Sequence, residues 1–362
     1  MALELVTAGE SHGPALVGIV TGLPAGLAVD REAIDADLRR RQQGYGRSAR
    51  QRIEHDEVEV LAGLRHGRTL GTPLALVVRN RDHRNWAWGM SPWPPEGEPA
   101  GKGVKPVTVP RPGHADLAGA LKYGLADVRD ALERASARHT AVIVAAGAVA
   151  KSFLRELGVG VCGRVLEDDL ERRVDDAREA RDTVGGIVEV RVSGAPPGLG
   201  SYATKEERLD ARLGATLLGT QAVKAVEIGD GFALATRRGS EAHDEIHRDE
   251  ERGLHRVTNR AGGIEAGVSN GEEIVVRAAM KPLPTLMRPL ASVDLATGER
   301  KQALVERSDT AAVEALAVVA EACVAFELAR AARGKFGGDA MGDVVAAHTA
   351  YLERIDWRPR TR

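Results

Sequence analysis

Aromatic residues, cysteines, net charge and long apolar runs are all scarce in this 362-residue chain. Phe, Trp and Tyr together make up 3% of the residues while Gly numbers 41, so the core must consist mainly of Ala, Val, Leu and Ile, joined by many tight turns. The formal net charge of -2 comes from 50 basic and 52 acidic residues, which leaves no overall field to attract nucleic acid or a membrane surface. Any anion must therefore be bound by a local group of cations.

The cysteines and the apolar segments also limit where such a protein resides. Cys162 and Cys323 stand in apolar surroundings without a disulfide or zinc-binding pattern, which is typical of a reducing compartment. The N-terminus lacks a basic region followed by an apolar run, and residues 141–150 fall far short of the roughly 20 needed to span a bilayer. We therefore expect a soluble, unprocessed cytoplasmic protein with no membrane partner and no metal ion.

The most informative stretch, residues 110–151, combines a turn, an amphipathic pattern and a buried segment. The turn displays His114, and apolar residues recur after it at helical spacing. Further on, Arg134 and Arg138 flank Ser136 among residues so small that a ligand can approach the backbone closely. A cationic, histidine-bearing cluster beside a buried segment is typical of a site for a flat or anionic ligand. The alternative is a capped helix with surface arginines, which is favoured for Arg134 taken alone.

A second cationic segment, residues 39–52, contains six arginines interrupted by Gly44 and Gly46. The glycines place the guanidinium groups on a turn instead of along one helix, which suits bidentate capture of phosphate or carboxylate. A solvated basic face is the simpler alternative. Nucleic-acid binding is disfavoured because acidic residues resume at Glu54.

The remaining pattern predicts one domain over residues 1–362, with an internal boundary possible in the turn cluster 194–200. Two segments without sustained periodicity, 79–105 and 237–260, are expected to be mobile loops. In the second of these, His243 and His247 lie four apart with acids between them, but the segment lacks the apolar residues that would hold a helix in place, so a loop that folds over a ligand is favoured over a metal site. Strands are predicted at 3–7, 15–21, 58–61, 73–78, 158–165 and 186–192, and helices at 32–41, 207–219 and 310–333.

Eight motifs carry a resemblance to one family. They are GESHG (9–13), GYGRSAR (44–50), RPGHADL (111–117), RASAR (134–138), AVEIGDGF (225–232), NRAGGIEAGVSNG (259–271), KPLPT (281–285) and RSD (307–309). In this order they resemble the chorismate synthases, from residue 3 to about residue 338.

The resemblance implies a lyase that ends the shikimate pathway and serves aromatic amino acid biosynthesis. Its reaction is the 1,4-anti elimination of phosphate from 5-enolpyruvylshikimate 3-phosphate to give chorismate, and it needs reduced FMN although no net redox change occurs. Because no segment resembles a built-in flavin reductase, an external NAD(P)H-dependent reductase is expected to supply the reduced cofactor. The resemblance also implies a homotetramer of α+β subunits, each a β-α-β sandwich in which antiparallel sheets enclose a helical core.

By the same resemblance, functional roles fall on residues of the motifs. His12 and His114 are the general acids, one near the flavin and one near the leaving phosphate, and Asp309 works with the flavin N5 as base. The substrate-binding residues are Ser11, Arg41, Arg47, Arg50, Arg111 and Arg138. The FMN-binding residues are Arg134, Ala135, Ser136, Gln221, Ala222, Ala266, Lys281, Pro282, Leu283, Pro284, Thr285 and Arg307.

Asp309 also suits the N-cap of the helix predicted at 310–333. Ala266 stands where the family commonly has Gly, so its methyl group is tolerable only at a negative φ, and His139 stands where Glu is frequent. A phosphate-handling enzyme without redox chemistry would explain the arginines and histidines but not the glycine-rich loop, and a nucleic-acid-binding module would use residues 39–52 alone.

Overall fold

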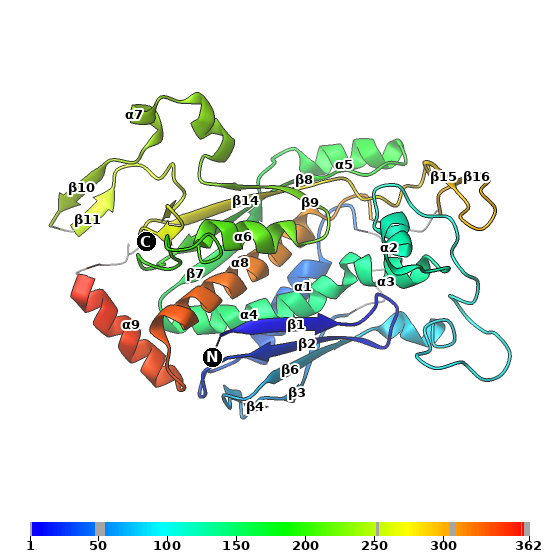
Figure 1. Ribbon diagram of the computed structural model, residues 1–362, viewed down its shortest axis with the longest axis horizontal. Coiled ribbons are helices and arrows are strands. Elements are labelled where there is room, and N and C mark those ends of the chain that lie inside the picture. Colours follow the sequence, from blue (N-terminus) through cyan, green and yellow to red (C-terminus); the bar gives the residue numbers. More distant parts are fainter. Residues whose placement is uncertain (1, 48–54, 251–252, 305–308, 356, 358–362) are drawn as a thin grey trace.

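The computed structural model describes residues 2–47, 55–250, 253–304, 309–355 and 357 (Figure 1). Two four-stranded antiparallel sheets lie on opposite sides of a layer of helices. The predicted α+β sandwich of antiparallel sheets around a helical core is confirmed. No helix in the described ranges is both long and apolar enough to cross a membrane.

The first sheet has the strand order β1-β2-β6-β3. Alternating side chains of β2 are buried, so Leu16 and Val20 face the helices while their neighbours face outward. The outer side exposes Val6 and Leu61. The strands are β1 (Glu4–Ala8), β2 (Ala15–Thr21), β3 (Val58–Ala62) and β6 (Leu74–Arg79).

The second sheet has the strand order β7-β8-β14-β9. Val188, Val190 and Val192 of β8 are buried toward the helices, and Val190 pairs with Val276 of the next strand. On the outer side Glu189 is 1% exposed because arginines surround it. The strands are β7 (Gly160–Val165), β8 (Gly186–Ser193), β9 (Val223–Ile228) and β14 (Ile274–Met280).

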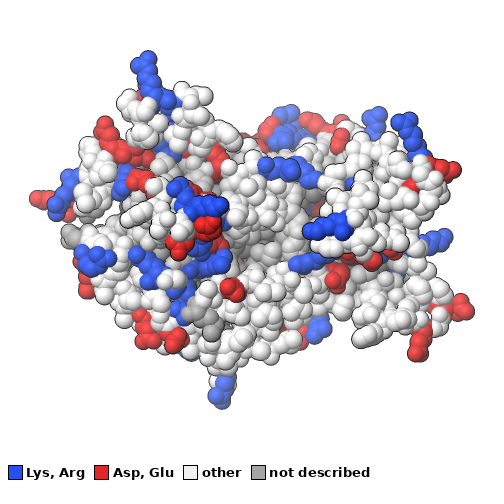
Figure 2. Space-filling model, in the orientation of Figure 1, with Lys and Arg blue, Asp and Glu red and all other residues white. Residues whose placement is uncertain are grey.

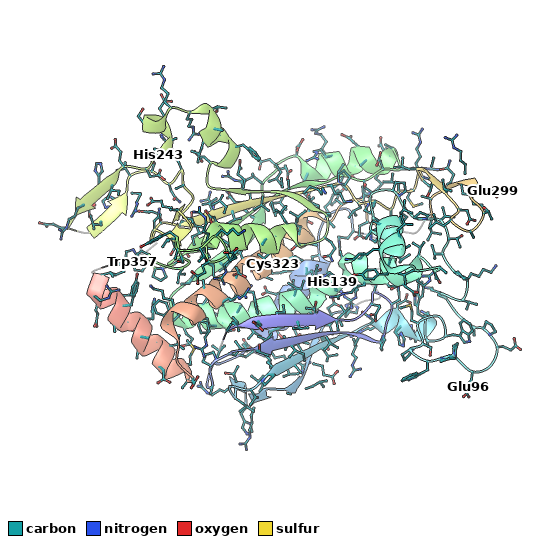
Figure 3. The ribbon with its side chains drawn as sticks, viewed as in Figure 1. Glu96, His139, His243, Glu299, Cys323 and Trp357 are labelled. Carbon is teal, nitrogen blue, oxygen red and sulfur yellow. The ribbon has the colours of Figure 1, made fainter. Side chains whose placement is uncertain are left out.

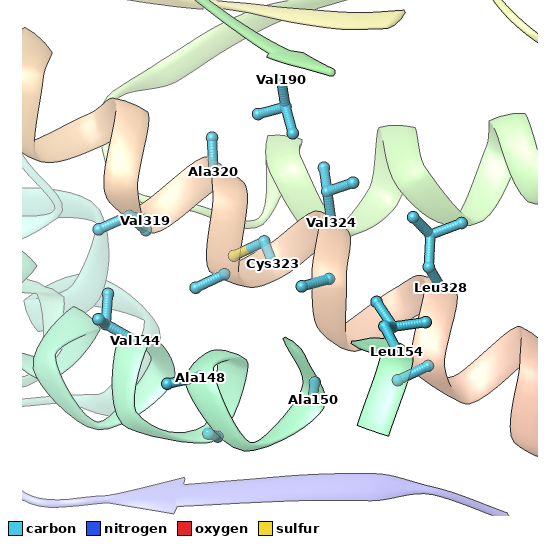
Figure 4. Close-up of a cluster of buried hydrophobic side chains, with 14 of the residues drawn as sticks. Val144, Ala148, Ala150, Leu154, Val190, Val319, Ala320, Cys323, Val324 and Leu328 are labelled. Atoms are coloured by element: carbon cyan, nitrogen blue, oxygen red, sulfur yellow. The ribbon is translucent and has the colours of Figure 1, made fainter. Parts of the chain in front are cut away.

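Small residues bring the two long helices of the middle layer together. A Cβ atom built at Gly147 of α4 would lie 2.3 Å from the Ala322 Cβ of α8, so this contact requires glycine. Val144 lies beside Val319, and Leu154 beside Leu328, so the two helices run parallel (Figure 4). The helices of this layer are α1 (Arg31–Gln42), α4 (Thr140–Glu156), α6 (Leu209–Leu218) and α8 (Val313–Phe336).

Shorter elements surround this sandwich. The segment predicted as the loop 237–260 forms an arm with a helix and a two-stranded hairpin (Figure 1). The peripheral helices are η2 (Arg81–Asn85), α2 (Asp116–Tyr123), α3 (Arg129–Ala135), η3 (Ala137–His139), α5 (Leu170–Glu179), η4 (Gly231–Thr236), α7 (Gly239–Ala242) and α9 (Met341–Ile355). The peripheral strands are β4 (Leu64–Arg65), β5 (Arg68–Thr69), β10 (Ile246–Asp249), β11 (Gly253–Arg256), β12 (Ile264–Glu265), β13 (Val268–Ser269), β15 (Ala291–Val293) and β16 (Arg300–Gln302).

Two predicted helices differ from the observed ones. The pattern after His114 does not form one helix, because Gly124 adopts a left-handed conformation (φ 66°) and ends α2 before α3 begins. The helix expected to begin at residue 310 begins at Val313, after Ala312. Asp309 is therefore not its N-cap, and that interpretation is wrong. Residues before and after the turn cluster 194–200, such as Val142 and Leu316, belong to one buried hydrophobic cluster.

Candidate active site

A cleft of about 520 Å³ lies where α4 and α8 begin. Because the two helices are parallel, the positive ends of both helix dipoles lie at this cleft, which favours anions. Its other walls come from the β1–β2 turn, the end of α1, the loop before α2, the α3–α4 junction, the segment after α6 and the loop after β14. A volume of this size is typical of a small-molecule site.

Most of the predicted site residues line this one cleft. They are Ser11, His12, Arg41, Arg47, Arg111, His114, Ala135, Ser136, Arg138, Gln221, Ala222, Lys281, Leu283, Pro284, Thr285 and Asp309. Arg134 and Pro282 are not among its lining residues, and Arg134 instead donates hydrogen bonds to Thr7 and to the carbonyl of Gly9. Arg50 and Arg307 lie outside the described residues.

Two of the arginines share a buried carboxylate that the motifs did not reveal. The side chain of Asp56 is fully buried, and its Oδ2 accepts from Arg41 Nη1 at 3.1 Å and from Arg138 Nη1 at 2.7 Å. Arg41 also donates to Thr140 Oγ1 at 2.9 Å. Burial lowers the pKa of Arg41 to about 10, against the opposing charge of Asp56. One carboxylate thus holds two guanidinium groups beside the cleft and leaves excess positive charge there.

A second buried carboxylate, Asp116, organises the turn that carries His114. Its oxygens accept from the backbone N–H of Arg111 at 3.0 Å, from Arg111 Nε at 2.9 Å and from His114 Nδ1. Burial acts to raise the pKa of Asp116, but the hydrogen bonds from His114 and Arg111 outweigh it and hold that pKa well below its ordinary value. Arg111 Nη1 also donates to Thr285 Oγ1 at 3.1 Å, which ties this turn to the loop after β14.

Asp309 forms an ion pair across the cleft. Its Oδ2 lies 2.7 Å from Arg47 Nη1, and the two side chains are 15% and 12% exposed. An aspartate that pairs with an arginine here neutralises part of the positive charge. Both side chains line the cleft, so the Asp309 carboxylate lies within reach of a ligand.

His139, which lies at the α3–α4 junction (Figure 3), forms a polar contact with Gln221. His139 Nδ1 lies 3.0 Å from the carbonyl oxygen of Ser136, which can only accept, so Nδ1 carries the hydrogen. Its Nε2 then accepts from Gln221 Nε2 at 3.2 Å. Burial lowers the pKa of His139, which agrees with a neutral ring. Gln221 Oε1 is buried with no hydrogen-bond partner in the described part of the chain, so it offers an acceptor to a ligand.

Ala266 is separated from the other predicted residues. It lines a second, smaller hollow with His243 and Ile264. Its φ is +48°, so the expected negative φ is wrong. The adjacent Gly267 also has a positive φ, and the backbone bends sharply between β12 and β13. The methyl group is therefore accommodated in a left-handed conformation that ordinarily favours glycine.

The motifs missed the residues that hold the functional side chains. Asp56 and Glu133 each lie outside the quoted motifs, and so does Trp86, which stacks on the His12 ring at 3.9 Å between centroids. Asp116 alone had a local signal, since it follows His114 by two residues. Contacts between segments as distant as His12 and Glu133 leave no local pattern in the sequence.

The charged residues described on one face of the molecule are mixed in sign. On the face drawn in Figure 2, basic and acidic side chains are interspersed without a continuous basic band. Duplex-binding surfaces usually present such a band. The cluster of cations inside the cleft is thus the notable feature of the charge distribution.

Comparisons with known proteins agree with the motif order. The family model described as chorismate synthase matches residues 3–168 and 164–332. The chain is 52% identical over 386 residues to the chorismate synthase of Desulforudis audaxviator (strain MP104C), covering 98% of each chain. It is 53% identical over 388 residues to that of Anaeromyxobacter dehalogenans (strain 2CP-1 / ATCC BAA-258), covering 98% of this chain and 100% of the relative.

The fold agrees as well. A solved structure described as a crystal structure of chorismate synthase matches with a TM-score of 0.77 and 34% identity, and covers 98% of both chains. Sequence, fold and the gathering of the motifs in one cleft lead to the same conclusion. The chain belongs to the chorismate synthase family, the lyases of the shikimate pathway that serve aromatic amino acid biosynthesis.

Proposed function

We propose that the cleft catalyses the family reaction, the 1,4-anti elimination of phosphate from 5-enolpyruvylshikimate 3-phosphate to give chorismate. One observation carries this proposal. Two histidines, each hydrogen-bonded to a buried carboxylate, line the same cleft as Asp309 and four arginines. The reaction needs this combination, because a substrate with two carboxylates and a phosphate must be bound, the phosphate must leave and a proton must be removed.

The residues present fit reduced FMN. Leu132, Leu283 and Leu316 supply apolar surface for a planar ring, and Lys281 supplies a cation. Gln221 Oε1, the buried acceptor without a partner, suits a ring N–H group. When bound, the reduced flavin supplies the electron-rich ring system on which the elimination depends. Ala135, Ser136, Ala222, Pro284 and Thr285 lie close enough to contribute to the same pocket. Arg134, Pro282, Ala266 and Arg307 remain proposed contacts on the family resemblance alone.

The arginines bind the substrate anions. Arg41 and Arg138 are already held by Asp56, so their orientation is set before a ligand arrives and little side-chain entropy is lost on binding. Arg47 can exchange its pairing with Asp309 for a substrate carboxylate or phosphate. Arg111 is fixed by Asp116 at the opposite wall. Ser11 and Arg50 complete the proposed set.

The proton-handling groups are His12, His114 and Asp309. Each histidine presents Nδ1 to a carboxylate, so Nε2 is the nitrogen that can give a proton on the cleft side. Asp309 holds the carboxylate that accepts a proton. The two buried carboxylates Glu133 and Asp116 fix the rings and are not themselves in the cleft lining.

The wider setting follows the family. We propose a homotetramer in the cytoplasm, supplied with reduced FMN by an external NAD(P)H-dependent reductase. The exposed Val6 and Leu61 on the outer side of the first sheet support association through that sheet.

An anaerobic assay with photoreduced FMN tests the reaction. Chorismate and phosphate should appear in equal amounts, and the flavin should be reduced at the start and at the end. Phosphate release at the same rate with oxidised FMN or without flavin would instead indicate a phosphate-handling enzyme without flavin chemistry. Duplex binding with a steep salt dependence and no chorismate would indicate a nucleic-acid-binding module.

A further inference from the structure

Glu133, in α3, contacts the β1–β2 turn that carries His12 through both its side chain and its backbone. Its Oε2 accepts from the backbone N–H of His12 at 2.8 Å, and its Oε1 lies 2.8 Å from His12 Nδ1. The backbone carbonyl of the same glutamate accepts from Ser11 N at 3.1 Å. The Glu133 side chain is only 1% exposed. A single residue thus clamps both the backbone and the ring of His12.

These contacts assign the hydrogens on the His12 ring. A carboxylate offers acceptors only, so the Nδ1 beside Glu133 must carry a hydrogen. In a neutral ring the lone pair then lies on Nε2, and in a charged ring Nε2 carries a second hydrogen. Because His12 lines the cleft, Nε2 is the nitrogen available for proton transfer there.

A stacking contact also restrains the His12 ring from rotating out of its plane. Trp86 is 8% exposed and stacks on His12, with 18° between the rings. Arg129 Cζ lies 5.0 Å from the centroid of the Trp86 ring, and Arg129 Nη1 lies 3.6 Å from Glu133 Oε1. Arg129 therefore links the stacking residue to the carboxylate. His83 Nδ1 donates to the carbonyl oxygen of His12 at 2.9 Å. The imidazole therefore has one orientation, set by residues from three separate segments.

We propose that Glu133 is a positioning residue that holds His12 in the Nδ1–H form, with Nε2 directed at the substrate, while Trp86 keeps the ring from rotating. Glu133 does not line the cleft, so it acts only through His12. The proposal rests on the proposed function, in which His12 transfers a proton. It also has a consequence independent of turnover, because the tautomer of His12 can be observed directly.

The test combines nitrogen NMR with kinetics on Glu133→Leu and Glu133→Gln. Leucine has nearly the same volume without any acceptor, so the His12 ring should lose its Nδ1–H preference in ¹⁵N-histidine spectra of the Glu133→Leu variant. Glutamine removes the negative charge and leaves one acceptor oxygen, so Nδ1 can no longer contact two acceptor oxygens at once. The His12 signals are identified by their absence in a His12→Gln variant.

Kinetics should show a fall in kcat and little change in KM. We expect kcat to fall roughly 10- to 100-fold in both variants, the range found when the hydrogen-bond partner of a metal-bound histidine is removed, with KM within about threefold of wild type. Glu189→Gln is the matched control, because Glu189 is also 1% exposed and surrounded by arginines but lies on the outer face of the second sheet. It should change neither the His12 spectrum nor kcat.

Two results would overturn the proposal. One is an Nδ1–H form of His12 that persists in Glu133→Leu. If the leucine variant does not fold, the corresponding result is an Nδ1–H form of His12 in Glu133→Gln together with a wild-type kcat. The other is a kcat loss in Glu189→Gln as large as in the Glu133 variants. If His12→Gln turns over like wild type, the role of His12 in the proposed function fails, but the spectra still decide whether Glu133 sets the ring.

Discussion

Replacing Asp56 with asparagine should destabilise the protein, and a bound anion should restore part of the lost stability. Asp56 Oδ2 lies 2.7 Å and 3.1 Å from two guanidinium nitrogens, and at an effective dielectric constant of about 20 each pair is worth about 5–6 kcal/mol of attraction. Against this stands a desolvation cost of several kcal/mol for the buried carboxylate. We therefore expect Asp56→Asn to lower the free energy of unfolding by about 3–5 kcal/mol, since two buried arginines lose their partner.

Thermal unfolding with and without inorganic phosphate measures both effects. The midpoint of Asp56→Asn should fall by several degrees, and phosphate should raise it by more than it raises the wild-type midpoint, because an anion in the cleft replaces the lost charge. Glu189→Gln, a buried carboxylate outside the cleft, should lose stability without this enhanced rescue. Equal rescue of wild type and Asp56→Asn would refute the view that Asp56 balances an anion-binding pair of arginines.

Three further changes have distinct expected outcomes. His12→Ala and His114→Ala should each lower kcat by roughly 10²–10⁴ while circular dichroism shows an intact fold, and activity within a few-fold of wild type would remove that histidine from the chemistry. Arg47→Ala should raise the substrate KM about 10- to 100-fold, as expected for a lost charge-assisted contact of about 1.5–3 kcal/mol, with FMN affinity little changed in a flavin titration; the reverse pattern would reassign Arg47. Burial lowers the pKa of His348, which packs edge-on against Phe336, so the unfolded state gains the proton first and stability falls as the pH drops through about 6.5. When chemical unfolding is measured between pH 7.5 and 5, the free energy of unfolding should fall less steeply with decreasing pH for His348→Gln than for wild type, and an identical slope would exclude His348 as a source of this pH dependence.

Local patterns predicted those parts of the fold in which one segment determines its own structure. Short apolar segments predicted β1 and β2 close to their observed bounds. At the start of α1, Asp30 accepts from the backbone N–H of Glu32 and so caps the helix within a single segment. The motifs also identified most residues of the cleft, because their order is specific to the family. The helix after His114 was predicted too long, since Gly124 stops it by a left-handed turn that periodicity does not register.

The residues that support the site were not predictable, because their partners are distant in sequence. Glu133 meets His12 across 121 positions, and Asp56 meets Arg138 across 82. The N-cap interpretation of Asp309 failed for a related reason. A short acidic side chain before an alanine-rich helix suits a cap, but Arg47 takes this carboxylate and the helix begins four residues later.

That the carboxylate of Asp309 takes part in the chemistry of the cleft is tested most directly by anaerobic single turnover of Asp309→Asn. Asparagine keeps the shape and an acceptor oxygen for Arg47 but cannot take up a proton, and the loss of one negative charge among arginines should leave substrate binding equal or slightly tighter. We predict a folded variant with near-normal FMN and substrate affinity whose formation of chorismate and phosphate is severely slowed. Stopped-flow traces that match wild type would contradict this account of the cleft and would mean that another group accepts the proton.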